Sequence, residues 1–385
     1  MSPSIRDRLL DVAGAFDLPA LVRHVGDAVR DQWAGAFPLP KAGLVRRLVI
    51  SGCGDSLFAG IASRLAIERF GGIACEPLDA LECGRYASVR FGEDVAVLAI
   101  SNSGTTSRAL ESLALAARAG ALTLSLTGAA RSPLQQIASG GVVRPVVGAG
   151  GRESPTSRVE RHLGEYIGTL VALYHLAFHL GVSRGVITEQ ERRHEAAAVE
   201  GAAEMAQRAL ADGPESIARA AEHLCDADRV FYLGAGPSFG TALFGAAKLL
   251  EEIPLCGVPQ YLEEWAHEQY FLTMMEGART RAVVVAPPGG STDRAVEVLQ
   301  SIRADGGVTV AVAHPQDEAV RQAAAATIAV DGDCWEGYAP LPYAVPMQLL
   351  GIALALHHGH TTIPLSRRDG GRLIRGSAIR GLHHA

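Results

Sequence analysis

The chain has 385 residues; 48% of them are hydrophobic, 20% are charged, and the formal net charge is −6 at pH 7. This length predicts two domains of about 150–180 residues each, and the composition is typical of a soluble globular protein with a large core. Because the net charge is negative, we expect neither a nucleic-acid-binding surface nor a nucleic-acid partner.

The segment before the first strand-like run is expected to be helical. Charged and apolar residues alternate over residues 5–12 in the manner of an amphipathic helix. This end of the chain does not show the pattern of a secretory signal peptide, so we expect a cytoplasmic protein with no membrane partner.

The cysteines give no sign of a metal site or of a disulfide framework. They are Cys53, Cys75, Cys83, Cys225, Cys256 and Cys334. We therefore expect reduced thiols, no metal and no other cofactor. Cys53 lies in a glycine turn, where a nucleophile would be conceivable. Since no histidine is close to it in sequence, we interpret it as a small buried residue that fills space.

A polar loop follows the apolar run Val95–Ile100. It reads Ser101-Asn-Ser-Gly-Thr-Thr106 and opens into an amphipathic helix predicted over residues 107–119. Hydroxyls and unpaired backbone N–H groups at a helix N-terminus form an anion site. An ordinary helix cap needs one hydroxyl, whereas four crowd these six positions. The loop therefore predicts a phosphate site.

The middle of the chain predicts two helices. The apolar stretch Tyr166–Leu180 carries two histidines and falls short of a membrane-spanning length, so we expect a buried helix. A linker is expected over residues 181–187. Thr188 and Glu191 then form a capping-box pattern that opens a polar helix, which is expected to end near Ala211.

The second half of the chain carries a candidate acid/base group. A strand-like run, residues 230–233, enters a glycine turn, and Lys248-x-x-Glu251 and Glu264-x-x-His267 follow. The i, i+3 spacing places Lys248 and Glu251 on one helix face. A carboxylate beside an ammonium stays ionised and can move a carbon-bound proton, while a histidine serves as a second acid/base. On a solvated helix, the same pair would be an ordinary surface ion pair.

Two parts of the chain repeat one design. The turn Gly52–Ser56 matches Gly234–Ser238 at an offset of 182 residues, and Ser101–Thr106 matches Pro287–Thr292 at an offset of 186. Strands are expected near residues 122–126 and 308–312. Alternating strands and helices imply parallel sheets with ligands at the carboxyl ends of the strands. The second loop has Pro287, Pro288 and Gly289 in place of Ser101, Asn102 and Ser103. Arg85 stands where the second copy has His267. We therefore expect one half to bind phosphate and the other to perform chemistry.

These motifs resemble the duplicated SIS (sugar isomerase) family. Its phosphosugar loop, Ser-x-Ser-Gly-x-Thr, fits residues 101–106, and the isomerase half of glucosamine-6-phosphate synthases has a Lys-x-x-Glu helix followed by a Glu-Leu-Lys-His segment at this spacing. The resemblance begins near residue 45 and runs to the C-terminus. It implies an α/β fold of two tandem doubly wound, flavodoxin-like, three-layer domains. The implied boundaries are an N-terminal helical segment, 1–44; domains at 45–185 and 212–360; and a tail, 361–385.

The resemblance also implies roles for individual residues. Glu251 would move a proton between C1 and C2, Lys248 would steady the developing oxyanion or the carboxylate, and Glu264 would orient His267. In that family the histidine comes from the neighbouring subunit and opens the sugar ring, so a homodimer is implied. The implied phosphosugar-binding residues are Ser56, Ser101, Asn102, Ser103, Thr106, Thr156 and Ser157.

Three departures bear on the reaction. Gly376 stands where the family has a catalytic lysine, Glu268-Gln269 replaces a Gly-Pro pair, and the sequence leaves no room for the family's N-terminal glutaminase. We therefore expect no glutamine-dependent amination. The resemblance favours an aldose–ketose isomerase or an amino-sugar 6-phosphate deaminase. A fructosamine-6-phosphate deglycase and a non-catalytic phosphosugar sensor are the alternatives.

Overall fold

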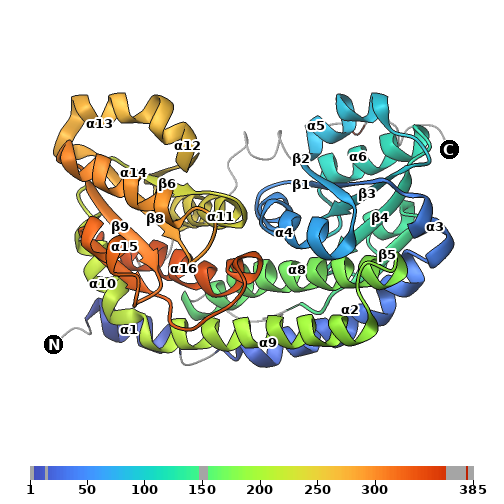
Figure 1. The fold of residues 1–385 in the computed structure, drawn as a ribbon, viewed down its shortest axis with the longest axis horizontal. Helices are drawn as coiled ribbons and strands as arrows, with labels where there is room; N and C mark the ends of the chain where they lie inside the picture. The colour runs from blue at the N-terminus through green and yellow to red at the C-terminus, as the bar shows by residue number, and fades with distance from the viewer. Residues whose placement is uncertain (1–3, 14–15, 147–154, 361–378, 380–385) are drawn as a thin grey trace. The chain divides into compact units, whose positions relative to one another are not determined.

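A computed structural model describes residues 4–13, 16–146, 155–360 and 379, with the backbone alone for 39–41 and 155–158. The chain divides into two compact units, each built around one sheet (Figure 1). The first-sheet unit comprises Leu21–Val147, Glu165–Val199 and Pro364–Ala385. The second-sheet unit comprises Met1–Ala20, Gly148–Gly164 and Glu200–Ile363.

The two sheets share one topology. The first contains β1 (Arg47–Gly52), β2 (Ala74–Asp79), β3 (Val95–Ile100), β4 (Leu122–Thr127) and β5 (Gly140–Val143). The second contains β6 (Arg229–Gly234), β7 (Cys256–Tyr261), β8 (Arg281–Ala286), β9 (Val308–Ala313) and β10 (Ala326–Ala329). Neighbouring strands are parallel, in the orders β2-β1-β3-β4-β5 and β7-β6-β8-β9-β10. This is the flavodoxin-like order, which occurs twice.

Helices follow most strands. Up to the middle of the chain they are α1 (Ile5–Ala13), α2 (Leu18–Ala36), α3 (Leu39–Leu44), α4 (Asp55–Gly71), α5 (Ala80–Arg85), η1 (Ala87–Arg90), α6 (Ser107–Arg118), α7 (Pro133–Ile137) and α8 (Pro155–Ser183). Beyond it they are α9 (Glu189–Asp212), α10 (Pro214–Glu222), α11 (Pro237–Glu252), α12 (Leu262–Glu264), η2 (Trp265–Gln269), α13 (Tyr270–Glu276), η3 (Gly277–Arg279), α14 (Thr292–Ala304), α15 (Glu318–Ala323), η4 (Glu336–Tyr338) and α16 (Pro340–His357).

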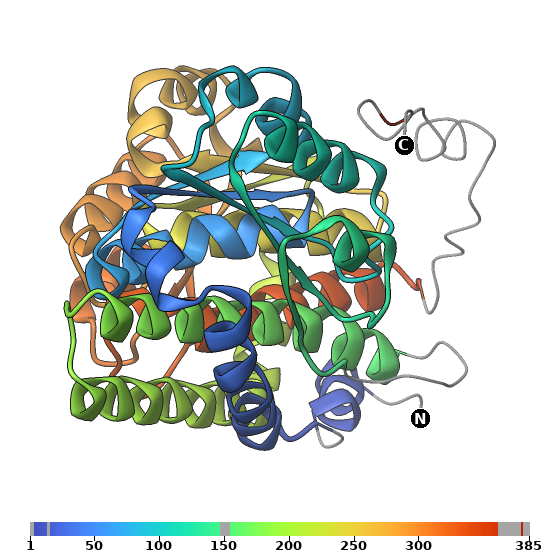
Figure 2. The same ribbon diagram turned by 90° about the vertical axis from the view of Figure 1, so that its right-hand side faces the viewer.

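The first sheet is covered by helices on both faces. Every residue of β3 is buried, the pattern of a parallel strand between two helical layers. Side chains of α5, α6 and α7 form one apolar core with β1 and β3. On the opposite face α4 packs against α8, where Gly71 approaches Leu180 (Figure 2).

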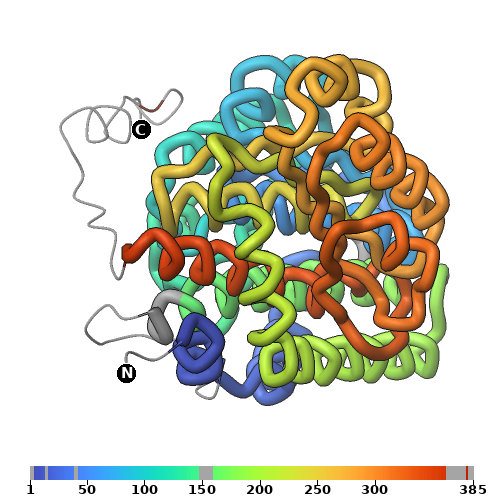
Figure 3. Tube along the Cα trace, turned by 90° about the vertical axis from the view of Figure 1, so that its left-hand side faces the viewer, coloured from blue at the N-terminus to red at the C-terminus, as the bar shows by residue number. Residues whose placement is uncertain are grey.

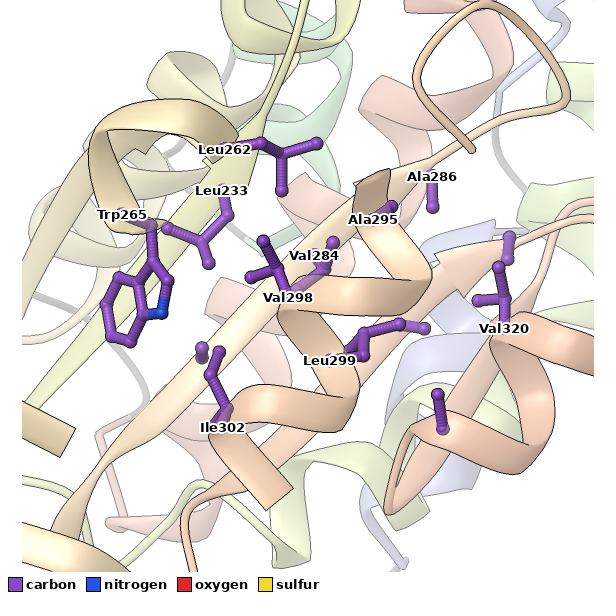
Figure 4. Close-up of a cluster of buried hydrophobic side chains, with 14 of the residues drawn as sticks. Leu233, Leu262, Trp265, Val284, Ala286, Ala295, Val298, Leu299, Ile302 and Val320 are labelled. Atoms are coloured by element: carbon purple, nitrogen blue, oxygen red, sulfur yellow. The ribbon is translucent and has the colours of Figure 1, made fainter. Parts of the chain in front are cut away.

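The second sheet has the same three layers. On one face α12, η2, α14 and α15 pack against the sheet, with Trp265 and Leu299 beside strand residues such as Val284 (Figure 4). On the other face α11 packs against β6, β7 and α16, and α10 crosses α16 (Figure 3). The predicted α/β fold with two tandem doubly wound domains is confirmed. The predicted domain boundaries stay predictions.

Local predictions in the described helices are confirmed. Helix α1 covers the predicted amphipathic segment. The capping box forms as expected: the backbone N–H of Thr188 donates to Glu191 Oε2 at 2.6 Å, and the N–H of Glu191 donates to Thr188 Oγ1 at 3.2 Å. It opens α9, which ends at Asp212. The linker expected from residue 181 starts three residues later, because α8 continues to Ser183.

One expectation about α8 needs correction. The apolar stretch judged too short to span a membrane belongs to a longer helical segment, Val159–Ser183, and both this segment and α16 are long and apolar enough to cross one. In the apolar windows of the two helices, 83% and 89% of the residues are buried inside the protein. They are therefore interpreted as core helices because of their burial, and not because of their length.

Candidate active site

The glycine turns and the loops that repeat in the sequence lie at the carboxyl ends of the strands in each sheet. In the first sheet, β1 and β3 are neighbours and the strand order reverses between them, because β2 lies on the far side of β1. The turn Gly52–Ser56 leaves β1 and the loop Ser101–Thr106 leaves β3. Both therefore lie at the topological switch point, where doubly wound sheets bind ligands. The turn after β6 and the loop after β8 hold the same positions in the second sheet.

The predicted phosphate loop is built around paired hydroxyls. Ser101 is 2% exposed and its Oγ lies 2.8 Å from Thr106 Oγ1. Ser103 is exposed, with its Oγ 2.8 Å from Thr105 Oγ1. Gly104 turns the loop with φ of 64°, and a Cβ there would lie 2.2 Å from Ser132 Oγ. Ser103 is thus accessible to a ligand, while the buried Ser101 contacts Thr106 within the loop.

A buried arginine donates a hydrogen bond to this loop. Arg144 is buried, and its Nη2 donates to Asn102 Oδ1 at 3.0 Å and also contacts Glu165. Because the amide oxygen of Asn102 faces Arg144, its NH₂ group is the part suited to donating to an anion. Sequence analysis did not find Arg144, which lies 42 residues further along the chain and belongs to no motif.

The first glycine turn contains Ser56 and Cys53. Ser56 is the second residue of α4 and is half-buried. A Cβ at Gly52 would lie 2.9 Å from the backbone nitrogen of Leu57, so the chain needs glycine there. Burial, together with the Asp79 carboxylate, raises the pKa of the Cys53 thiol. A protonated thiol is a poor nucleophile. Cys53 is half-buried, however, so the expectation that it is a buried residue is wrong.

In the second sheet the equivalent loop holds one of the protein's own carboxylates. The backbone N–H of Gly290 donates to Glu336 Oε2 at 3.0 Å. A Cβ at Gly289 would lie 2.4 Å from the carboxyl carbon of Glu336, so only glycine admits this side chain so closely. Thr292 Oγ1 accepts from the N–H of Gly289 at 3.0 Å. The loop in which Pro287, Pro288 and Gly289 replace the first three polar residues is thus in contact with Glu336.

Lys248 and Glu251 form an ion pair in which the lysine is buried and the carboxylate is partly exposed. Lys248 Nζ donates to Glu251 Oε2 at 2.7 Å, and Lys248 is only 1% exposed. The same ammonium lies 5.1 Å from the ring centroid of Phe244. Helix α16 approaches this part of α11 closely, since a Cβ at Gly351 would lie 3.3 Å from the carbonyl oxygen of Lys248. A lysine this buried requires a charged partner.

His162 is a neighbour of Glu251 that sequence analysis missed. Its Nδ1 lies 3.3 Å from Glu251 Oε2, and both residues belong to the second-sheet unit. The Nδ1 is shielded from solvent, and its geometry is that of an ion-pair contact and not of a well-aligned hydrogen bond. Only the tertiary structure brings this residue of α8 to α11.

His267 lies in the short π-helical turn η2, and its side chain is 71% exposed. Its Nε2 lies 3.4 Å from Oε1 of Glu263, which also contacts Arg294. Sequence analysis gave Glu264 the orienting role, whereas the carboxylate that the structure places against this imidazole is that of Glu263. The side chains of Thr156 and Ser157, as well as Gly376, lie outside the described residues.

The described residues contain no group of three or more His, Cys, Asp or Glu side chains placed to hold a metal ion. The polar groups on which the candidate site rests are the paired hydroxyls of the loop after β3 and, in the second-sheet unit, a carboxylate in contact with an ammonium and an imidazole.

The family model for the SIS domain matches residues 45–142, which include β1 to β4 and both loops at the first switch point. The chain carries a SIS domain. Its second sheet repeats the strand order of the first.

Curated relatives include glutamine–fructose-6-phosphate aminotransferases. The protein of Methanothermobacter thermautotrophicus is 26% identical over 339 residues, which cover 86% of this chain and 53% of that protein. The protein of Zymomonas mobilis is 28% identical over 364 residues, which cover 89% and 55%. The chain spans about half the length of these relatives.

Solved structures share the fold. The C-terminal domain of the glucosamine-fructose-6-phosphate aminotransferase of Francisella tularensis aligns with a TM-score of 0.72 at 20% identity, covering 90% of this chain and 97% of that one. The tagatose-6-phosphate ketose/aldose isomerase of Escherichia coli gives 0.68 at 17%, covering 94% of both. The glucosamine-6-phosphate deaminase of Thermotoga maritima gives 0.59 at 15%, covering 90% and 96%.

Proposed function

We propose that this chain is a phosphosugar enzyme that transfers a proton between C1 and C2, as an aldose–ketose isomerase or an amino-sugar 6-phosphate deaminase. The observation that carries the proposal is the contact of buried Lys248 with Glu251 at 2.7 Å. An ammonium beside a carboxylate keeps it ionised, and an ionised, partly exposed carboxylate is a general base. Proteins that are similar to this chain in sequence or in fold have names that give a phosphosugar as their substrate. This similarity supports the substrate class.

The proposal divides the work among named residues. The hydroxyls of Ser101, Ser103 and Thr106, with Ser56 and the Asn102 amide, bind the phosphate. Charge-assisted hydrogen bonds to a phosphate are among the stronger ones in proteins. Glu251 takes the C2 proton of the open-chain sugar and returns it at C1, and Lys248 stabilises the negative charge that develops.

His267 is proposed to open the sugar ring across the interface of a homodimer. Its side-chain exposure of 71% supports this role, because a histidine used by a neighbouring subunit must be accessible. Mixing inactive Glu251→Gln and His267→Ala proteins should restore part of the activity in hybrid dimers. An active protein that sediments as a monomer would refute the shared site.

The proposed reaction is tested by solvent exchange. The protein is incubated in D₂O with a panel of hexose, hexosamine and fructosamine 6-phosphates, and deuterium at C2, ketose, ammonia and amine are followed. Deuterium should enter at C2 of at least one aldose 6-phosphate with the wild type and not with Glu251→Gln. Amine release from fructosamine phosphate alone would identify a deglycase. Binding with neither exchange nor release would identify a sensor.

A further inference from the structure

We propose that His162 is a positioning residue for the general base: its imidazole holds the Glu251 carboxylate against Lys248, in the orientation that proton abstraction needs. This inference rests on the proposed function, because it assigns a task in proton transfer. His162 exchanges no proton with the sugar. The proton that leaves C2 goes to Glu251 and returns from Glu251 to C1.

Two groups from different helices converge on one carboxylate oxygen. Lys248 Nζ on α11 and His162 Nδ1 on α8 lie 2.7 Å and 3.3 Å from Glu251 Oε2. Lys248 lies three residues before Glu251 on the same helix, so its contact reaches the carboxylate only from the side of α11. The contact from His162 comes from another element and supplies that second direction.

The burial of the three side chains is graded. The exposed fractions are 1% for Lys248, 16% for His162 and 37% for Glu251. The carboxylate therefore contacts Lys248 and His162 inside the protein, while more than a third of the Glu251 side chain is accessible to a ligand. A general base needs this combination of a fixed orientation and access to the reacting C–H bond.

An imidazole can contact the carboxylate without bringing a second full positive charge to it. Two full positive charges on one carboxylate would lower its basicity. A neutral imidazole with its proton on Nδ1 donates to the carboxylate without adding net charge. The distance of 3.3 Å is long for such a bond, but catalytic contacts are often loose in the absence of substrate and tighten in the complex.

The kinetic test compares two replacements of His162. His162→Asn keeps an N–H donor near the position of Nδ1, whereas His162→Leu keeps bulk and removes the donor. We expect His162→Leu to lower the kcat for C2 deuterium exchange about 10- to 100-fold, the effect of a misplaced catalytic group, with KM and Tm near wild type. His162→Asn should recover most of the rate. His223→Ala, at an exposed histidine after α10, is the matched control.

A second measurement separates the failure of this inference from the failure of the proposed function. The ¹⁵N chemical shifts of the His162 imidazole are compared between the wild type and Glu251→Leu, with no substrate present. A shift of Nδ1 on loss of the carboxylate supports the positioning contact, and unchanged shifts overturn it. If the wild type exchanges no proton, the proposed function fails while the NMR result still decides the contact. If His162→Leu exchanges at the wild-type rate, the positioning role is wrong.

Discussion

The ammonium of Lys248 and the carboxylate of Glu251 are 2.7 Å apart on α11, and the two side chains are 1% and 37% exposed. The same three-residue spacing is common on solvated helices, where an ion pair contributes about 0–1 kcal/mol and signals no function. Here the lysine is buried, and an unpaired lysine there would be costly. The chain thus keeps a charged amine inside the protein beside a carboxylate that solvent can still reach.

Glu251→Gln should lower kcat by roughly 10²–10⁴ while phosphosugar binding is kept, the range for loss of one general base. Amide and carboxylate have nearly the same shape, so binding should be kept, while Tm should fall because the buried Lys248 loses its charged partner. Steady-state kinetics and calorimetric binding check both parts. Glu297→Gln is the matched control, since Glu297 pairs with Arg294 at the same spacing on an exposed helix surface. Lost binding in Glu251→Gln would give this residue a binding role instead.

Ser103→Ala should raise KM for a phosphorylated sugar about 10- to 100-fold, since a hydrogen bond to a charged group contributes roughly 1.5–3 kcal/mol. Ser103 is exposed, so Tm should stay within a few degrees of wild type. Ser101→Ala should affect both quantities, because this buried hydroxyl also contacts Thr106. Thr292→Ala, at the equivalent loop of the second sheet, should leave KM unchanged. An unaltered KM in the Ser103 variant would remove this loop from the phosphate site.

Glu336→Ala should destabilise the protein by about 1–3 kcal/mol, because the N–H of Gly290 loses a charged acceptor. Glu336→Gln keeps an oxygen in place and should cost less. Urea unfolding of the two variants measures the difference. KM for the phosphosugar should not change, since this carboxylate occupies the loop of the second sheet. A lower KM in Glu336→Ala would mean that the carboxylate competes with the substrate.

Unfolding experiments between pH 7 and pH 4 should reveal His175. Burial lowers the pKa of this imidazole from 6.5 to about 4. Between these two values the unfolded chain binds the proton and the folded protein does not. The free energy of unfolding therefore falls as the pH drops through this window, by up to about 3 kcal/mol from this residue, and levels off below it.

The comparison that isolates His175 uses a neutral replacement. His175→Gln should flatten the pH dependence by that amount, relative to wild type measured in the same buffers. His194→Gln, at an exposed histidine of α9, is the control and should follow the wild-type curve. Parallel curves for wild type and His175→Gln would show that His175 is protonated in the folded protein.

The sequence alone determined the α/β architecture and the local features that are formed by residues close together in the chain. The apolar run of β3 and the repeated offsets predicted two parallel sheets with ligands at the carboxyl ends of the strands, because strand burial and glycine turns are encoded locally. Thr188 and Glu191 predicted their own hydrogen bonds, since a capping box closes within three residues. The spacing of Lys248 and Glu251 likewise predicted that they share a helix face.

Only the tertiary structure decided which side chains from distant segments meet. The spacing of Lys248 and Glu251 left open whether the pair is solvated, and the tertiary structure buries the lysine on a helix that packs against α16. Arg144 reached Asn102, Glu336 reached Gly290, and His162 reached Glu251, each from another element. No period or spacing encodes such contacts, because they depend on how the elements pack against one another and on which face each helix turns to its neighbour.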